Sequence, residues 1–241
     1  MKKLRIISLV LVITLVFSFS AVAQNNKVEV NPSDETENVR AGGGFSIGMI
    51  NLDVSSLNNI LQDAGFAKLD ENVLMYGGGG IGGKKMGYRF GGLGTGGSLK
   101  STNSNNDKKA VLDIGYGGFV VEKGIYSKDK IDVAWSGLIG AGDMQLTLIH
   151  NEPGPFEEVV TGVNQSNDPY SVTMTKSFFT IEPGINMHYQ INDLVGLDLA
   201  AGYLFTFDMG EDWNIKDETV NDGPLSNISS PHLSVQLSFG F

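Results

Sequence analysis

The sequence predicts an all-β chain in which eight antiparallel strands, joined in sequence order, close into an up-and-down barrel. Three observations predict it. Apolar and polar residues alternate over most of the chain after residue 40, the connections between these stretches are short and long in turn, and no second long apolar segment follows the first twenty residues. Alternate side chains of a strand point to opposite faces. A bundle of membrane-spanning helices is excluded, because each would need about 20 apolar residues.

The last strand, residues 230–241, has a clear alternation. Leu233, Val235, Leu237, Phe239 and Phe241 fall on one face, and the residues between them are polar or small. This aromatic ending resembles the closing strand of bacterial outer-membrane β-barrels, whose terminal Phe is part of a signal read by the barrel-assembly machinery. The resemblance implies that Leu237, Phe239 and Phe241 form an assembly signal and that this machinery is a partner.

The amino terminus predicts export. Lys2, Lys3 and Arg5 precede an apolar stretch, and Ala21-Val22-Ala23 ends it, as in a secretory signal peptide spanning residues 1–23. An uncleaved membrane anchor is the alternative. Residues 24–40 are polar and acidic and are expected to form a flexible leader. The barrel would then occupy residues 41–241, in the cell outer membrane.

Charge and cysteine content exclude several classes of function. The net charge of −10 falls to −13 when the three basic residues of the signal peptide are removed, which argues against a nucleic-acid partner. The absence of cysteine excludes disulfides, thiolate metal sites, a cysteine nucleophile and a lipid-anchored amino terminus. No cofactor and no metal are expected.

The alternation defines the expected elements. Strands are expected near 42–51, 71–83, 86–97, 110–121, 131–150, 171–190, 195–206 and 230–241. A short helix is expected within 53–64 of the first connection, with Asp53 at its start and Gly65 at its end. This helix would pack over the barrel rim or, alternatively, bind a partner or the membrane interface.

The faces of the strands follow from the same pattern, on the expectation that apolar residues face lipid and polar residues face the lumen. In the fourth strand Leu112, Ile114, Tyr116 and Val120 are predicted outward and Asp113 inward. The second strand is left unassigned, because the glycines at 77–80 erase its pattern.

The connections support a membrane barrel independently of the alternation. The second, fourth and sixth are tight, and the first, third (98–108), fifth (151–170) and seventh (208–229) are wide. Outer-membrane barrels have short periplasmic turns, longer external loops and an even number of strands. Residues 41–241 therefore resemble, in layout, the small eight-stranded barrels of the OmpA and OmpX type.

Charged residues on the inward faces predict a network that fills the lumen. Its expected members are Arg89, Asp113, Asp132, Lys176, Glu182, His188 and Asp198. Buried charges need partners, so a structural plug is the main interpretation and an ion path gated by the network is the alternative. Arg89 is expected to pair with Glu182 or Asp198.

Other motifs carry little chemistry. The glycines at 78, 80 and 83 match the spacing of a nucleotide-binding loop, but Lys85 stands where Ser or Thr is required, and a glycine-rich hairpin turn explains them better. His232 and Ser234 resemble the His-x-Ser of outer-membrane lipid A deacylases, yet no acid follows Ser234. Acidic residues of the external loops could hold divalent cations or a basic partner, although no calcium-loop pattern is present. They are Glu152, Glu157, Glu158, Asp168, Asp208, Glu211, Asp212, Asp217, Glu218 and Asp222.

The sequence therefore predicts an outer-membrane barrel that is not an enzyme and that displays acidic external loops to surface partners or lipopolysaccharide. Three alternatives remain open. They are a soluble periplasmic barrel of the lipocalin kind, a porin-like channel for small solutes, and a lipid hydrolase embedded in the barrel. The first would need the apolar face of each strand inside.

Overall fold

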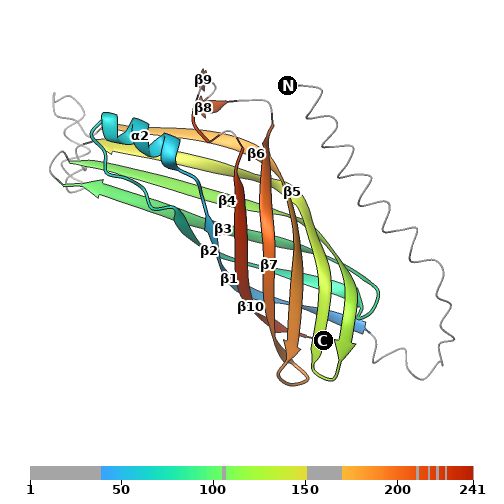
Figure 1. The fold of residues 1–241 in the computed structure, drawn as a ribbon. Coiled ribbons are helices and arrows are strands. Elements are labelled where there is room, and N and C mark those ends of the chain that lie inside the picture. Colours follow the sequence, from blue (N-terminus) through green and yellow to red (C-terminus); the bar gives the residue numbers. More distant parts are fainter. Residues whose placement is uncertain are drawn as a thin grey trace, which may run out of the picture. The chain divides into compact units, whose positions relative to one another are not determined.

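A computed structural model describes residues 39–104, 107–150, 170–209, 212–216, 218–220, 223–225 and 227–240. Eight long strands form an antiparallel ring in the order β5-β4-β3-β2-β1-β10-β7-β6, and pairing of β5 with β6 closes it (Figure 1). The predicted eight-stranded up-and-down barrel is confirmed. The strands are β1 (Val39–Asn51), β2 (Asn72–Lys84), β3 (Tyr88–Asn103), β4 (Lys108–Lys128), β5 (Ile131–His150), β6 (Tyr170–Gln190), β7 (Val195–Asp208) and β10 (Ser229–Phe239). The connections hold helix α2 (Ser55–Asp63) and the short strands β8 (Trp213–Ile215) and β9 (Glu218–Val220).

The two ends of the barrel differ. At the turn end, residues 85–87, 129–130 and 191–194 make tight connections. At the loop end lie α2, β8 and β9. The third connection, expected to be wide, is only 104–107, because β3 and β4 stay paired as far as Asn103 and Lys108. The predicted signal peptide, most of the leader, residues 151–169 and Phe241 lie outside the described residues.

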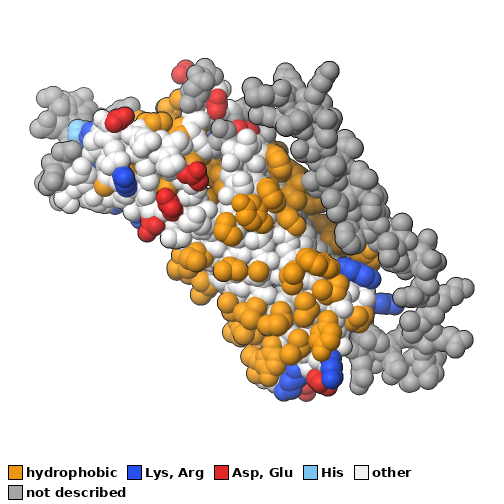
Figure 2. All heavy atoms as spheres, in the orientation of Figure 1, with side chains coloured by type: hydrophobic (Ala, Val, Ile, Leu, Met, Phe, Trp, Pro, Cys, Tyr) orange, Lys and Arg blue, Asp and Glu red, His pale blue; other side chains and the backbone are white. Residues whose placement is uncertain are grey.

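Apolar side chains cover the outside of the barrel over the part nearer the turn end (Figure 2). Leu237 is 44% exposed and Leu199 is 38% exposed, whereas Asp198 is only 5% exposed. The apolar parity of these strands thus faces outward and the polar parity faces the lumen, as predicted. The lipocalin-like alternative is wrong, since it requires the reverse.

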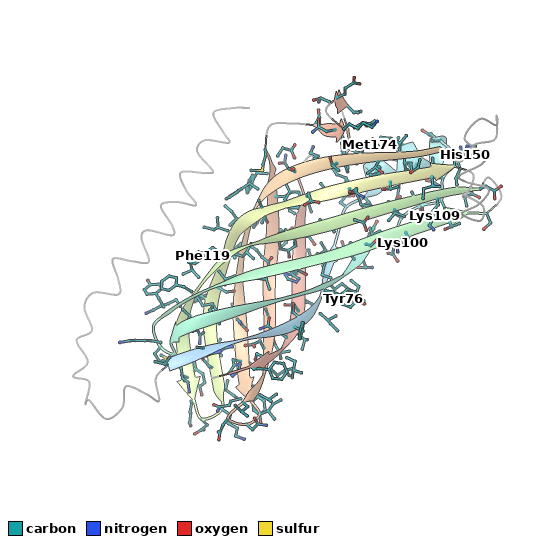
Figure 3. The ribbon with its side chains drawn as sticks, turned by 180° about the vertical axis from the view of Figure 1, so that it is seen from behind. Tyr76, Lys100, Lys109, Phe119, His150 and Met174 are labelled. Atoms are coloured by element: carbon teal, nitrogen blue, oxygen red, sulfur yellow. The ribbon has the colours of Figure 1, made fainter. Side chains whose placement is uncertain are left out.

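Strand β4 corrects the predicted pattern. Leu112, Ile114 and Tyr116, expected on the outer face, are buried inside, while Phe119 is 53% exposed on the outer wall (Figure 3). Asp113 consequently points outward. Val120, also expected on the outer face, lines the lumen cavity. The prediction failed because β4 passes from a region whose outer face is apolar into a region whose outer face is polar.

Glycines permit the tight curvature of β1, β2 and β3. A Cβ atom at Gly44 would overlap the carbonyl oxygen of Leu237, and one at Gly91 would overlap that of Gly80. The glycines at 77–83, expected in a hairpin turn or resembling a phosphate loop, lie within strand β2 and pair with β1 and β3. A nucleotide loop is therefore excluded there.

Four strands continue past the ends of β1, β7 and β10 at the loop end (Figure 1). We call these segments the loop-end extension and the closed ring below them the barrel body. The extension consists of residues 98–103, 108–113, 145–150 and 170–175. Strands β4, β5 and β6 have 20 or 21 residues, about twice the 9 to 11 that a strand needs to cross a bilayer.

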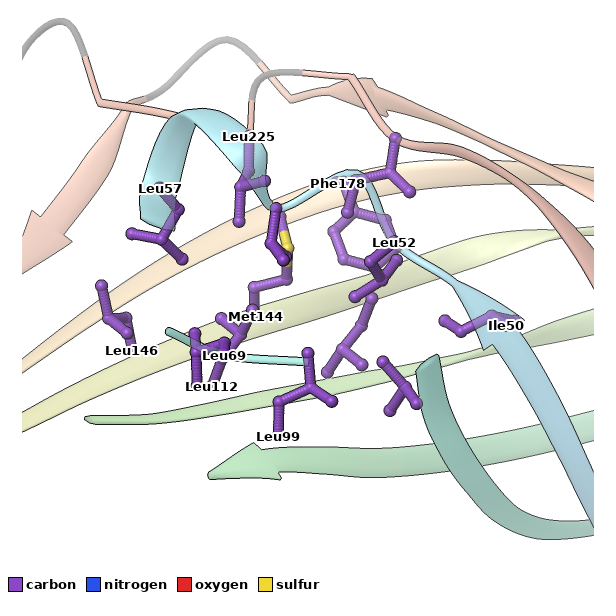
Figure 4. Close-up of a cluster of buried hydrophobic side chains, with 14 of the residues drawn as sticks. Ile50, Leu52, Leu57, Leu69, Leu99, Leu112, Met144, Leu146, Phe178 and Leu225 are labelled. Carbon is purple, nitrogen blue, oxygen red and sulfur yellow. The ribbon is translucent and has the colours of Figure 1, made fainter. Parts of the chain in front are cut away.

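The inner face of the extension carries the apolar core of the chain (Figure 4). Leu112 and Leu146 from the strands meet Leu57 and Leu61 of α2, and Trp213 of β8 is buried in the same cluster. The outer face of the extension is polar and includes Lys100 and Lys109 (Figure 3). Along β4, therefore, the apolar residues move from the outer wall of the body to the inner face of the extension.

Local hydrogen bonds fix α2 over this core. Gly65 has a φ of 83°, its N–H donates to Gln62 O at 2.8 Å, and Phe66 N–H donates to Leu61 O at 2.8 Å. These two bonds form a Schellman motif, in which a left-handed residue ends the helix. At the other end Asp53 accepts hydrogen bonds from the N–H and hydroxyl of Ser55, which lower the pKa of the Asp53 carboxyl.

The return segment after α2 covers the edge of β3. Ser101 Oγ donates to Ala67 O at 2.8 Å, and Asn103 Nδ2 donates to Gly65 O at 2.9 Å. The buried Asn58 side chain holds the segment in place with two hydrogen bonds. Its Nδ2 donates to Leu69 O at 3.0 Å, and its Oδ1 accepts from Leu69 N–H at 2.8 Å. The first connection is thus a fixed part of the extension.

Candidate functional site: the charged lumen and its apolar cover

The turn-end layer of the lumen is built around Arg89. This side chain projects inward from β3 with no exposed surface, and its Nε lies 2.9 Å from Glu122 Oε2 of β4. Arg89 Nη1 also donates to Asp132 of β5. The guanidinium thus joins three neighbouring strands. Since each buried charge has an opposite partner, part of the desolvation cost of the group is offset.

A second guanidinium completes this layer from the opposite wall. Arg40 of β1 donates to Asp198 of β7, and its Nη1 lies 3.8 Å from Asp132 Oδ2. His188 Nδ1 of β6 lies 3.0 Å from Asp198 Oδ1. Asp132 therefore connects the two arginines, and the linked side chains extend across the lumen from β3 to β7.

A smaller polar cluster lies nearer the loop end. His232 Nδ1 of β10 is 2.6 Å from Glu182 Oε1 of β6, and Tyr116 Oη donates to Glu182 Oε2 at 3.0 Å. A cavity of about 110 Å³ is lined by residues of both layers, among them Glu122 and Asn186. Its polar lining and size suit a few water molecules.

The loop-end mouth is closed by apolar side chains and by the ion pairs of Lys176 with Asp208 and Asp212, which we call the Lys176 latch. Phe178, Met144 and Leu204 are buried above the polar layers. Beside them the buried Lys176 Nζ of β6 lies 3.3 Å from Asp208 Oδ2 and 3.6 Å from Asp212 Oδ1. These ion pairs hold the start of the seventh connection, where β8 pairs with β6 at Asn214 and Thr175.

Six of the seven residues predicted for the lumen network face inward, but the predicted contacts differ. Asp113 is the exception, because the parity of β4 was assigned backwards. Arg89 does not pair with Glu182 or Asp198; its partners are Glu122 and Asp132. Lys176 belongs to the separate latch at the loop end.

Sequence reasoning missed four members of the network, namely Arg40, Glu122, Tyr116 and His232, the last of which it placed in a His-x-Ser motif and not in the network. Arg40 was placed in the flexible leader, although its position has the same parity as the inward Ser46. Glu122 and Tyr116 were missed with the parity of β4. The structure begins β1 at Val39, and a predicted strand with this start would have placed Arg40 on the inward face.

The motifs considered for chemistry find no support here. His232 and Ser234 line the lumen cavity, away from the outer wall, although Glu182 supplies the acid that the sequence lacked nearby. Asp208 and Asp212 of the acidic loops bind Lys176. The acids at 152, 157, 158, 168, 211, 217 and 222 lie outside the described residues. Within the described ranges no group of three His, Asp or Glu side chains is placed to hold a metal ion.

The closed ladder, apolar outer wall and charged lumen define an eight-stranded β-barrel of the outer-membrane type. In the described part of the chain, no helix is long and apolar enough to span a membrane. A side-chain-filled lumen is typical of barrels with eight strands.

No protein-family model matches the sequence, and no match was found among curated proteins. Solved structures show a similar fold at low sequence identity. Ail, the attachment invasion locus protein of Yersinia pestis, in complex with the heparin analogue sucrose octasulfate, gives a TM-score of 0.43 at 10% identity, covering 84% of this chain and 98% of Ail. Neisserial surface protein A gives 0.36 at 11%, covering 84% and 97%. The outer membrane protease OmpT of Escherichia coli gives 0.32 at 8%, covering 85% and 97%.

Proposed function

We propose that this protein is a non-enzymatic outer-membrane barrel whose closed body anchors the loop-end extension at the cell surface, where it displays the extension and its loops to partners. The observation that carries the proposal is the change of apolar face along single strands. Phe119 of β4 is exposed on the outer wall of the body, whereas Leu112 of the same strand is buried inside the extension. A strand with this change of face is suited to a body surrounded by lipid and an extension surrounded by water.

The lumen supports display over transport. The linked charges of Arg40, Arg89 and their acidic partners cross the body, and the apolar cluster with the Lys176 latch lies above them. A solute would have to break both layers to pass. The same two layers would keep the wall rigid, so that the extension is held at a fixed angle to the membrane.

The extension itself supports a binding role. Its inner face is filled by α2 and β8, so its outer sheet face and its loops remain for contact with other molecules. We propose the acidic loops of this end, including those outside the described residues, as the contact region for basic partners or divalent cations. Assembly of the barrel would use Leu237, Phe239 and Phe241 as the signal, after export directed by residues 1–23.

Single cysteines test the location and orientation, because the natural chain has none. Lys100→Cys lies on the outer face of the extension, and Asp193→Cys lies in an exposed turn at the turn end. With intact cells and a membrane-impermeant maleimide, we expect labelling of the Lys100→Cys variant alone. The Asp193→Cys variant should react only after the outer membrane is permeabilised. Labelling of both variants in intact cells, or of the Asp193→Cys variant alone, would contradict the proposal.

A further inference from the structure

Lysines gather at the turn end of the barrel, where Lys84, Lys128 and Lys130 are exposed and Lys85 and Lys123 are half-buried. We call Lys84, Lys85, Lys123, Lys128 and Lys130 the lysine collar; they lie in the β2–β3 and β4–β5 turns and the strand ends beside them. The unburied acids of the described turn end are Asp129 and Asp193, whereas Asp132, Glu122 and Asp198 are buried against arginines. This end therefore presents a positive surface on a chain whose net charge is negative (Figure 2).

The collar lies at the edge of the apolar wall. Lys123 is paired across the strands with Tyr88, and its Nζ lies 4.7 Å from the centre of the Tyr88 ring. Tyr88 stacks on Phe90, and Phe90 stacks on Phe119, so an aromatic row leads from the collar into the wall. Tyrosines of membrane proteins are enriched at the level of lipid headgroups, and lysines beside them extend their ammonium groups toward water.

Backbone contacts hold the collar together. Gly124 N–H of β4 donates to Gly87 O of the β2–β3 turn at 3.0 Å, and a Cβ atom at Gly124 would overlap Lys85 O. The turn carrying Lys84 and Lys85 is thus docked beside Lys123. Lys130 Nζ donates to Ile191 O at 3.3 Å, which ties the β4–β5 turn to its neighbour and leaves two of its three donors for other acceptors.

We propose that the lysine collar binds the phosphate groups of anionic glycerophospholipids in the membrane leaflet that surrounds the turn end. The ammonium groups lie where the apolar wall ends, which is where lipid phosphates lie when the body is in a bilayer. Lysines near an anionic membrane surface attract its headgroups, and one contact corresponds to about a fivefold preference. The inference rests on the proposed placement of the body in a membrane.

The test uses the full-length mature chain in vesicles of phosphatidylcholine that contain a trace of spin-labelled lipid. Electron paramagnetic resonance gives the association of phosphatidylglycerol relative to phosphatidylcholine at the protein surface. We expect a several-fold preference of the wild type for phosphatidylglycerol, weakened at high salt. In the triple variant Lys84→Gln, Lys123→Gln and Lys128→Gln the ratio should fall toward one.

A matched variant separates the collar from net charge. Lys68→Gln, Lys100→Gln and Lys216→Gln remove three exposed lysines of the loop end and should leave the preference unchanged. Lys→Arg changes at the three collar positions should retain it. Equal association of the two lipids with the wild type, or an equal loss of the phosphatidylglycerol preference in the two triple variants, would overturn the proposal that the collar binds lipid phosphates. A wild type that does not insert, judged by identical gel mobility before and after boiling, would instead overturn the proposed membrane placement.

Discussion

The barrel body and the loop-end extension are built from the same strands and place their side chains in opposite ways. In the body, apolar residues such as Phe119 and Leu199 cover the outside and charged residues such as Arg89 fill the inside. In the extension, Leu112 is buried inside under α2, while Lys100 faces outward. The backbone ladder runs through both regions with one register shift, at Gly124 and Tyr126 between β4 and β5.

The comparison shows that the surroundings decide which face of a strand is apolar. Lipid tails favour an apolar outer wall, so the polar parity is left for the lumen. In water the outer face must be polar, and the inner face then needs a cover, which α2 and β8 provide. The body is stabilised inside by paired charges and the extension by apolar packing.

The largest effect that could break this comparison is expected in the lumen of the body. Arg89→Met leaves the buried carboxylates of Glu122 and Asp132 without their shared partner, which should cost about 3–5 kcal/mol of unfolding free energy. Urea unfolding in vesicles, followed by gel mobility without boiling, measures the loss. Lys100→Met on the exposed extension is the control, with a change within about 0.5 kcal/mol.

Neutral side chains in place of the two acidic partners of Arg89 make the unfolding test of the Arg89→Met variant more specific. Adding Glu122→Gln and Asp132→Asn to Arg89→Met removes the stranded charges and should recover much of the lost stability. If Arg89→Met costs no more than Lys100→Met, paired charges do not stabilise the body, and the contrast between the two regions fails.

A smaller effect is expected in the core of the extension. Leu112→Ala opens a cavity under α2 and should cost about 2–5 kcal/mol, whereas Val111→Ala, on the outer face of the same strand, should cost less than about 1 kcal/mol. The chain has two tryptophans, of which Trp135 lies on the outer wall of the body and Trp213 is buried in the extension. In a Trp135→Phe background, Trp213 fluorescence during urea unfolding reports on this core. Equal costs at 111 and 112 would contradict the assigned faces.

The smallest effect concerns the end of α2. Gly65→Ala forces a side chain into the left-handed region and should weaken the helix end by about 1 kcal/mol. We expect faster protease cleavage in 55–69 with unchanged resistance of the body to urea. The neighbouring exposed change Gln62→Ala keeps the helix geometry and is the control. Loss of body stability in the Gly65→Ala variant would mean that the two regions unfold as one.

The sequence was sufficient for the strand order and for most of the faces. Strand β7 lies in the body, and its large apolar side chains face outward from Val195 to Tyr203, so a single rule holds as far as Leu204, which is buried in the apolar cluster at the loop end. Strand β4 crosses into the extension, where the rule reverses. Gly115, Gly117 and Gly118 lie where β4 passes from the extension into the body, and glycines do not show which face is apolar. The faces of β4 were therefore assigned from Leu112, where apolar residues face inward, and the same assignment was wrong for the rest of the strand.

The lumen contacts could not be predicted because they depend on stagger between strands. Parity places Arg89, Glu182 and Asp198 in one lumen, but their heights along the barrel axis follow from the register. The observed ladder sets Arg89 opposite Glu122 on β4, whereas Glu182 is paired with Leu138 on β5, farther from the turn end. Arg40 was lost for a different reason, since its polar surroundings in the sequence resemble a leader more than a strand.

The hydrogen bonds from Ser101 and Asn103 to the segment after α2 have a consequence for protein at high density in a membrane. The backbone N–H and C=O groups along the edge of β3 in the extension could accept a strand of a neighbouring molecule. The side-chain hydrogen bonds hold the segment at 65–69 against this part of β3, where it obstructs such a strand, so we expect crowded copies to lie side by side without joining into a continuous sheet.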